Sequence, residues 1–151
     1  MIRSRAFCLL AFLLPILLVA CGKKEAQEVA APHSIGGSVL RGKVEQAAGV
    51  ALPMEGNVFD FTLTCSPLYE LTWSAITIPA SDGRYTYENL GDNKAVLHFE
   101  SVLGDQRGKL LLQFDSEERG SFDGHYLTIG GVVGEGTFSG TFELKTSSSC
   151  Q

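Results

Sequence analysis

Hydrophobic and polar residues alternate with a period of two along most of the chain after residue 37. In one segment, apolar residues on one face alternate with smaller and mostly polar residues on the other: Phe59, Phe61, Leu63 and Cys65 against Val58, Asp60, Thr62 and Thr64. A β-strand sends successive side chains to opposite faces, so this period predicts strands with one buried face. No helical period of comparable length competes with it.

The same alternation, interrupted by turn-forming residues, predicts eight or nine strands. Their ranges are Val39–Val44, Asn57–Thr64, Leu71–Ile78, Arg84–Glu88, Lys94–Ser101, Lys109–Asp115, Gly120–Phe122, Tyr126–Val133 and Thr137–Lys145. Strands this numerous and evenly spaced predict an all-β domain with a single antiparallel barrel of about eight strands, because closure removes exposed strand edges. A two-sheet β-sandwich is the alternative.

Four short clusters of glycine, aspartate and asparagine predict tight reversals between strands, because these residues tolerate the backbone angles of turns. The clusters are Ser81-Asp82-Gly83, Gly91-Asp92-Asn93, Gly104-Asp105 and Asp123-Gly124.

Large aromatic residues fall on the apolar side of the predicted strands. They are Phe59, Phe61, Tyr85, Tyr87, Phe99, Phe114, Phe138 and Phe142. A barrel of about eight strands either fills with its own side chains or holds one small ligand, and so many large inward residues favour a filled interior. If the interior is hollow instead, Tyr85, Tyr87 and Phe99 are the residues expected to face a ligand.

The N-terminus has the pattern of a secretory signal. Arg3 and Arg5 form a positive region, Ala6–Ala20 is apolar, and small residues precede Cys21, as signal cleavage requires. The apolar run would span about 22 Å as a helix, less than the roughly 30 Å hydrocarbon core of a membrane. A cleaved signal is therefore favoured over a retained membrane helix.

The residues Leu18-Val19-Ala20-Cys21 at the end of this run resemble the lipid-attachment box of bacterial lipoproteins. This resemblance implies cleavage before Cys21, acylation of its thiol, and anchoring in the cell envelope through the lipid. Gly22 follows the cysteine, and in enterobacterial-type sorting this implies the outer membrane, with the protein facing the periplasm.

The chain is expected to have three parts: a signal peptide over residues 1–20, a lipidated N-terminus and flexible tether over residues 21–37, and a β-barrel-like domain over residues 38–151.

Loss of Arg3 and Arg5 with the signal peptide leaves 10 of the 12 basic residues against 17 acidic residues, a net charge of −7. Such a surface repels phosphate backbones, so nucleic acid is not an expected partner.

A segment of about 40 residues resembles the calycin-like barrels of the lipocalin type. The pattern consists of Tyr85-x-Tyr87, Asn93-x-Ala95-x-Leu97-x-Phe99, Leu112-x-Phe114 and Gly120-x-Phe122. The resemblance implies a carrier of a small apolar ligand. The chain departs from the lipocalins in lacking their Gly-x-Trp near the first strand, because its single tryptophan is Trp73.

The four cysteines have separate expected fates. Cys8 is lost with the signal and Cys21 receives the lipid, which leaves Cys65 and Cys150 in the mature domain. In an oxidising periplasm such a remaining pair forms a disulfide. A Cys65–Cys150 bridge would tie the C-terminal tail to the end of the second strand.

No catalytic, metal or cofactor motif stands out. The three histidines lack ligand spacing, the acidic cluster Asp115–Asp123 lacks the spacing of a calcium loop, and no serine lies in a nucleophile elbow. The sequence therefore predicts a binding or scaffolding module with no catalytic residue, no metal and no cofactor. The expected partner is an envelope protein or a small apolar ligand; a carrier is the first alternative and an enzyme whose site assembles only in the fold is the second.

Overall fold

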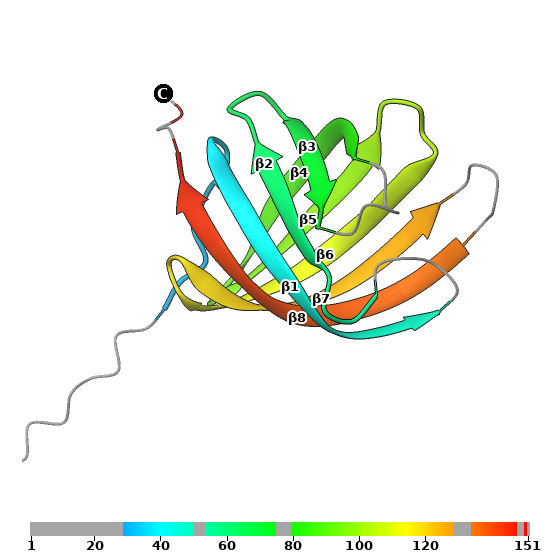
Figure 1. Ribbon diagram of the computed structural model, residues 1–151. Helices are drawn as coiled ribbons and strands as arrows, with labels where there is room; N and C mark the ends of the chain where they lie inside the picture. The colour runs from blue at the N-terminus through cyan, green and yellow to red at the C-terminus, as the bar shows by residue number, and fades with distance from the viewer. Residues whose placement is uncertain (1–28, 50–53, 75–79, 129–133, 148–149, 151) are drawn as a thin grey trace, which may run out of the picture.

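Eight antiparallel strands follow one another around a closed barrel in the computed structural model, which describes residues 29–49, 54–74, 80–128, 134–147 and 150. In chain order they are β1 Ser38–Gly49, β2 Val58–Leu63, β3 Leu68–Trp73, β4 Ser81–Gly91, β5 Lys94–Ser101, β6 Gln106–Ser116, β7 Arg119–Thr128 and β8 Gly134–Thr146. Each strand pairs with its chain neighbours, and β1 pairs with β8 to close the barrel (Figure 1). The predicted barrel is confirmed, and the β-sandwich alternative is wrong.

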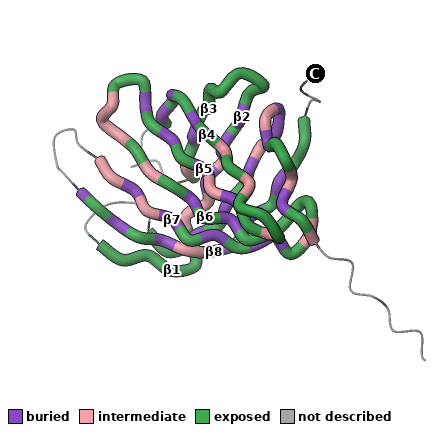
Figure 2. Tube along the Cα trace, turned by 180° about the vertical axis from the view of Figure 1, so that it is seen from behind, coloured by how far each residue is buried: buried purple, intermediate pink, exposed green. Residues whose placement is uncertain are grey.

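Burial alternates along the strands as the sequence pattern predicted (Figure 2). In β5, for example, Ala95, Leu97 and Phe99 are buried while His98 and Glu100 between and after them are exposed. The inward residues of all eight strands form one apolar core inside the barrel.

The number of strands differs from expectation because of one region, and the limits of other strands differ as well. The strand expected over Leu71–Ile78 is β3, which covers Leu68–Trp73, and the last residues of the expected range lie outside the described residues. The strand expected over Gly120–Phe122 and the first three residues of the one expected over Tyr126–Val133 are parts of a single strand, β7, and the turn expected at Asp123-Gly124 lies in its middle. Residues 129–133 lie outside the described residues. Gly124 faces inward under the ring of Phe138: a Cβ added to it would lie 2.6 Å from the Phe138 Cζ atom. The glycine therefore makes room for a ring and does not reverse the chain.

The turn expected at Ser81-Asp82-Gly83 is also wrong, because these residues begin β4. A Cβ on Gly83 would lie 2.0 Å from the carbonyl oxygen of Glu100 in the neighbouring strand, so this glycine permits a close approach of two backbones. The other two predicted turns are confirmed: Gly91-Asp92-Asn93 joins β4 to β5, and Gly104-Asp105 lies between β5 and β6.

Residues 29–37, here called the N-terminal strap, pack against one end of the barrel. Ala31 and Ile35 are buried in the core. The Tyr87 hydroxyl donates a hydrogen bond of 2.8 Å to the Pro32 carbonyl, and the Asn89 side-chain amide donates one of 2.7 Å to the Ala31 carbonyl. The folded unit therefore includes residues 29–37, which the sequence pattern placed in the tether; residues 21–28 lie outside the described residues.

The barrel end that carries the strap, called the strap end, also holds the disulfide between Cys65 and Cys150. Cys65 lies two residues after β2, and the bridge joins the C-terminal tail to it across 85 residues of sequence. The predicted disulfide is thus present. Gly36 of the strap lies beside the bridge, since a Cβ added there would lie 3.2 Å from the Cys150 Sγ atom.

Candidate functional site

Aromatic rings fill the interior of the barrel. Phe61 lies edge-on to Phe99 with ring centroids 4.9 Å apart, and Phe99 in turn lies 5.8 Å from Tyr69. A second group of rings surrounds Phe59, with Phe122 at 5.4 Å and Trp73 at 5.0 Å. Such separations are those of packed aromatic pairs.

The three residues expected to face an internal ligand are placed differently from one another. The Tyr85 hydroxyl donates a hydrogen bond of 2.8 Å to the Thr64 carbonyl, and the Tyr87 hydroxyl binds the strap. The Phe99 ring packs among the core rings and is 4 % exposed. These side chains already have partners within the protein, so they do not converge on a shared ligand space inside the barrel.

The outer face of strands β4 to β8 carries two parallel rows of mostly polar side chains. Strand register places Thr86, His98, Lys109, His125 and Thr137 opposite one another in the first row. The second row, two residues along each strand, contains Arg84, Glu100, Arg107, Leu127 and Glu135. Residues directly opposite across neighbouring strands have Cβ atoms about 5 Å apart, so adjacent members of a row can act on one ligand.

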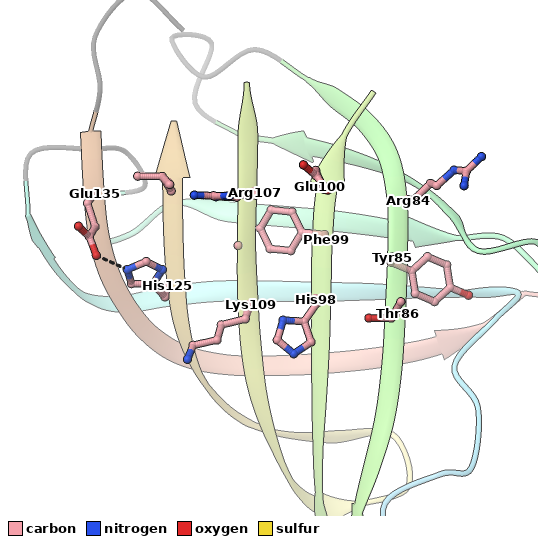
Figure 3. A pocket seen from close by; sticks show the side chains of 12 residues that line it. Arg84, Tyr85, Thr86, His98, Phe99, Glu100, Arg107, Lys109, His125 and Glu135 are labelled. Carbon is pink, nitrogen blue, oxygen red and sulfur yellow. Dashed lines mark hydrogen bonds and ion pairs between the residues drawn. The ribbon is translucent and has the colours of Figure 1, made fainter. Parts of the chain in front are cut away.

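All members of these rows except Thr137 line a groove on the outer surface of the barrel with a volume of about 640 Å³. Figure 3 shows His98 and Lys109 side by side on β5 and β6, and Arg107 above Lys109 on the same strand. Arg84 points away from the centre of the groove in this view. The centre of the groove is therefore formed by strands β5 to β8.

An ion pair closes one side of the groove. The His125 Nε2 atom lies 2.6 Å from Glu135 Oε1 on β8 (Figure 3, dashed line). Because a carboxylate accepts hydrogen bonds only, His125 donates from Nε2, and a neutral imidazole then presents Nδ1 as an acceptor. In the described part of the chain, the ion pairs are this one and Arg41–Asp60, so neither Arg107 nor Lys109 belongs to an ion pair.

A second outer hollow, of about 410 Å³, is lined by both basic and acidic residues. Arg41 binds Asp60 there through two hydrogen bonds, of 2.7 and 2.6 Å. These bonds, with the attraction of the same guanidinium, lower the pKa of Asp60 from its ordinary value against the opposing effect of burial. Lys43, Arg119, Asp115 and Glu143 also line this hollow, so its lining, like that of the groove, has three basic and two acidic side chains.

Sequence reasoning assigned His98 and His125 to the surface but missed that they flank Lys109. The alternation of each strand does show that all three face outward, and this is the signal that could have suggested a common face. Alternation within a strand does not show which residues of neighbouring strands are opposite one another. The register between strands decides this, and it forms the row.

Cys21 lies outside the described residues. Among the described residues, no group of three or more histidine, cysteine, aspartate or glutamate side chains could hold a metal ion. None of the described segments is a helix with the length and apolar character needed to cross a bilayer.

Compared with known protein families, curated proteins and solved structures, the chain has no significant match.

Proposed function

We propose that this protein is a bacterial lipoprotein, anchored through a lipid on Cys21 to the periplasmic face of the outer membrane, whose barrel binds or scaffolds an envelope partner. The observation that carries the binding part of the proposal is the packing of the interior. Rings 4.9–6.4 Å apart occupy the space that a carrier would need for its ligand, and the hollows lined by charged residues lie on the outer face. Binding through the outer surface therefore fits this barrel better than carriage inside it.

With a lipid on Cys21, the strap would set which end of the barrel faces the membrane. Eight peptide units separate Cys21 from Val29, and a chain of that length spans at most about 29 Å even when fully extended. An acylated Cys21 would hold the strap end close to the lipid surface. The opposite end carries the turn between β5 and β6, where Val102 is 72 % and Leu103 85 % exposed, and it would project into the periplasm.

The anchor is tested by mass spectrometry of the chain recovered from bacterial membranes. We expect loss of residues 1–20 and a lipid mass on Cys21; an unmodified thiol in a chain recovered from the soluble fraction contradicts the anchor. The Cys21→Ala variant is the matched control and should be released from washed membranes.

The binding role is tested by photo-cross-linking in intact cells, with a photoreactive amino acid placed at Leu103 or at Leu111, which is 40 % exposed on the outer face of β6. We expect one envelope protein to be captured repeatedly, at lower yield with Cys21→Ala, and the purified pair to bind each other. Failure to capture a consistent protein from either position contradicts the scaffolding role. A small apolar molecule retained by the native protein in mass spectrometry would instead favour the lipocalin-like carrier.

A further inference from the structure

The groove on β5 to β8 contains two basic side chains, Arg107 and Lys109, that belong to no ion pair among the described residues. The chain as a whole has 17 acidic and 12 basic residues. Across the middle of the groove, the row His98, Lys109 and His125 contains no carboxylate, and Arg107 lies on the same face of β6 as Lys109. In an acidic protein, two basic side chains that lack a carboxylate partner offer local attraction to anions that most of the surface repels.

We propose that this groove binds a small ligand through an oxyanion, a carboxylate or a phosphate, held between Lys109 and Arg107. The two residues are two positions apart on one strand, and so their Cα atoms lie about 6.7 Å apart. Both side chains are long enough to converge on one anion from that separation. An ammonium provides three donors and a guanidinium five, and such charge-assisted hydrogen bonds to oxyanions are stronger than neutral ones.

The histidines on either side of Lys109 complete the site in different ways. His98 is directly opposite Lys109 on β5 and has no partner among the described residues, so it is available as a further donor to the ligand. His125 is opposite Lys109 on β7, and it already binds Glu135. By engaging Glu135, His125 provides that carboxylate with a partner other than Lys109, and this leaves the ammonium available to an incoming anion.

Glu100 limits which ligands suit the groove. It is directly opposite Arg107 on β5 and is exposed, yet no ion pair joins the two within the described part of the chain. Glu100 would accept hydrogen bonds from hydroxyl or amine groups beside the anion. The groove volume of about 640 Å³ is within the range of small-molecule sites. The ligand class is therefore a small polar molecule with one oxyanion and adjacent donors.

Anion binding in the groove requires neither the lipid on Cys21 nor a protein partner. Each of the two proposals can therefore fail while the other stands. Its test is a nuclear magnetic resonance titration of the full chain in nonionic detergent, at constant ionic strength, with inorganic phosphate in one arm, succinate in the second and glycerol as the uncharged probe. We expect saturable shifts of the amides of His98, Lys109 and His125 with phosphate or succinate and none with glycerol. The arm that saturates identifies the anion.

Lys109→Gln and Arg107→Gln should each weaken binding by about tenfold or more, because each removes a charge-assisted hydrogen bond. The matched control is Lys94→Gln, a lysine exposed on the same face of β5 but outside the groove; it should leave binding unchanged. All three residues are exposed, so the variants should fold, and their amide spectra verify this. Shifts that stay linear with both anions, or equal losses in Lys94→Gln and Lys109→Gln, would overturn the proposal.

Discussion

The ring of Phe59 occupies the space over Gly42 on the neighbouring strand. The two residues are directly opposite in the β1–β2 pair, and a Cβ added to Gly42 would lie 2.1 Å from the Phe59 Cζ atom. The same arrangement recurs twice: Phe99 covers Gly108, and Phe138 covers Gly124, with corresponding distances of 2.5 and 2.6 Å. In each pair a glycine provides the space that lets a phenylalanine ring lie flat against the inside of the barrel.

Gly42→Ala should therefore destabilise the protein. The added methyl group collides with the Phe59 ring, and overpacking of this kind costs about 1–3 kcal/mol. The free energy of unfolding in urea measures the effect. Lys43→Ala, at the exposed neighbouring position, is the control and should change stability by less than about 0.5 kcal/mol.

Gly42→Ala in a Phe59→Leu variant tests whether the ring causes the loss of stability, because a leucine leaves room over residue 42. There, Gly42→Ala should cost less than in the parent protein, and the difference is the coupling energy of the pair. Equal costs in the two backgrounds would show that the collision with the ring is not the cause.

Ile35→Ala should loosen the N-terminal strap. Ile35 is 1 % exposed, and truncation of such a buried side chain typically costs about 2–5 kcal/mol. The specific readout is hydrogen exchange of the Ala31 amide, which donates to the Asp92 carbonyl, and of the Gly37 amide, which donates to the Leu63 carbonyl. Both should exchange faster relative to amides in β6. His33→Ala, at an exposed strap position, should leave both rates unchanged, and unchanged rates in Ile35→Ala would mean that the side chain does not hold the strap.

Removal of the disulfide should lower stability strongly. The bridge spans 85 residues, and the chain-entropy model gives up to about 4.5 kcal/mol for a loop of this size. The Cys65→Ser/Cys150→Ser double variant should therefore unfold at lower urea concentration than the oxidised parent. Reductant should lower the urea midpoint of the parent to that of the double variant and should leave the midpoint of the double variant unchanged. An equal urea midpoint for the oxidised and reduced parent would contradict a stabilising bridge.

Alkaline pH should destabilise the fold through its tyrosines. Burial raises the pKa of Tyr87 and of Tyr126 to about 12, above the value of about 10 that tyrosine has in an unfolded chain. The folded state thus holds these protons more tightly than the unfolded state. Their contribution to stability is complete below about pH 10 and is lost as the pH rises towards about 12.

Urea unfolding at several pH values across this interval measures the slope, and the absorbance of tyrosinate follows the titration of the folded protein. Tyr87→Phe should reduce the slope, because it removes one of the tyrosines whose pKa is raised by burial. It should also remove the hydrogen bond to the Pro32 carbonyl, at a cost of about 1 kcal/mol at neutral pH. A slope as steep in Tyr87→Phe as in the parent would exclude this tyrosine as a cause.

The alternation of residues by itself determined which side chains face inward, because the pleat of a strand sends neighbours to opposite faces whatever the strand pairs with. Phe59, Phe61, Leu97 and Phe99 were predicted to be inward and are buried. The closed barrel followed from the number and spacing of the strands. The disulfide followed from elimination, since two cysteines remained after the signal segment was set aside.

Tertiary structure alone decided which residues of different strands are opposite one another, because pairing depends on the register between segments and alternation within one strand carries no register. Gly83 and Gly124 were for this reason interpreted as turn residues, whereas each lies inside a strand and gives space to a neighbour. The strap has no apolar period, yet its Ile35 is buried by the barrel end. The row of His98, Lys109 and His125 likewise exists because β5, β6 and β7 pair in one register, which joins three outward-facing residues of separate strands into one groove.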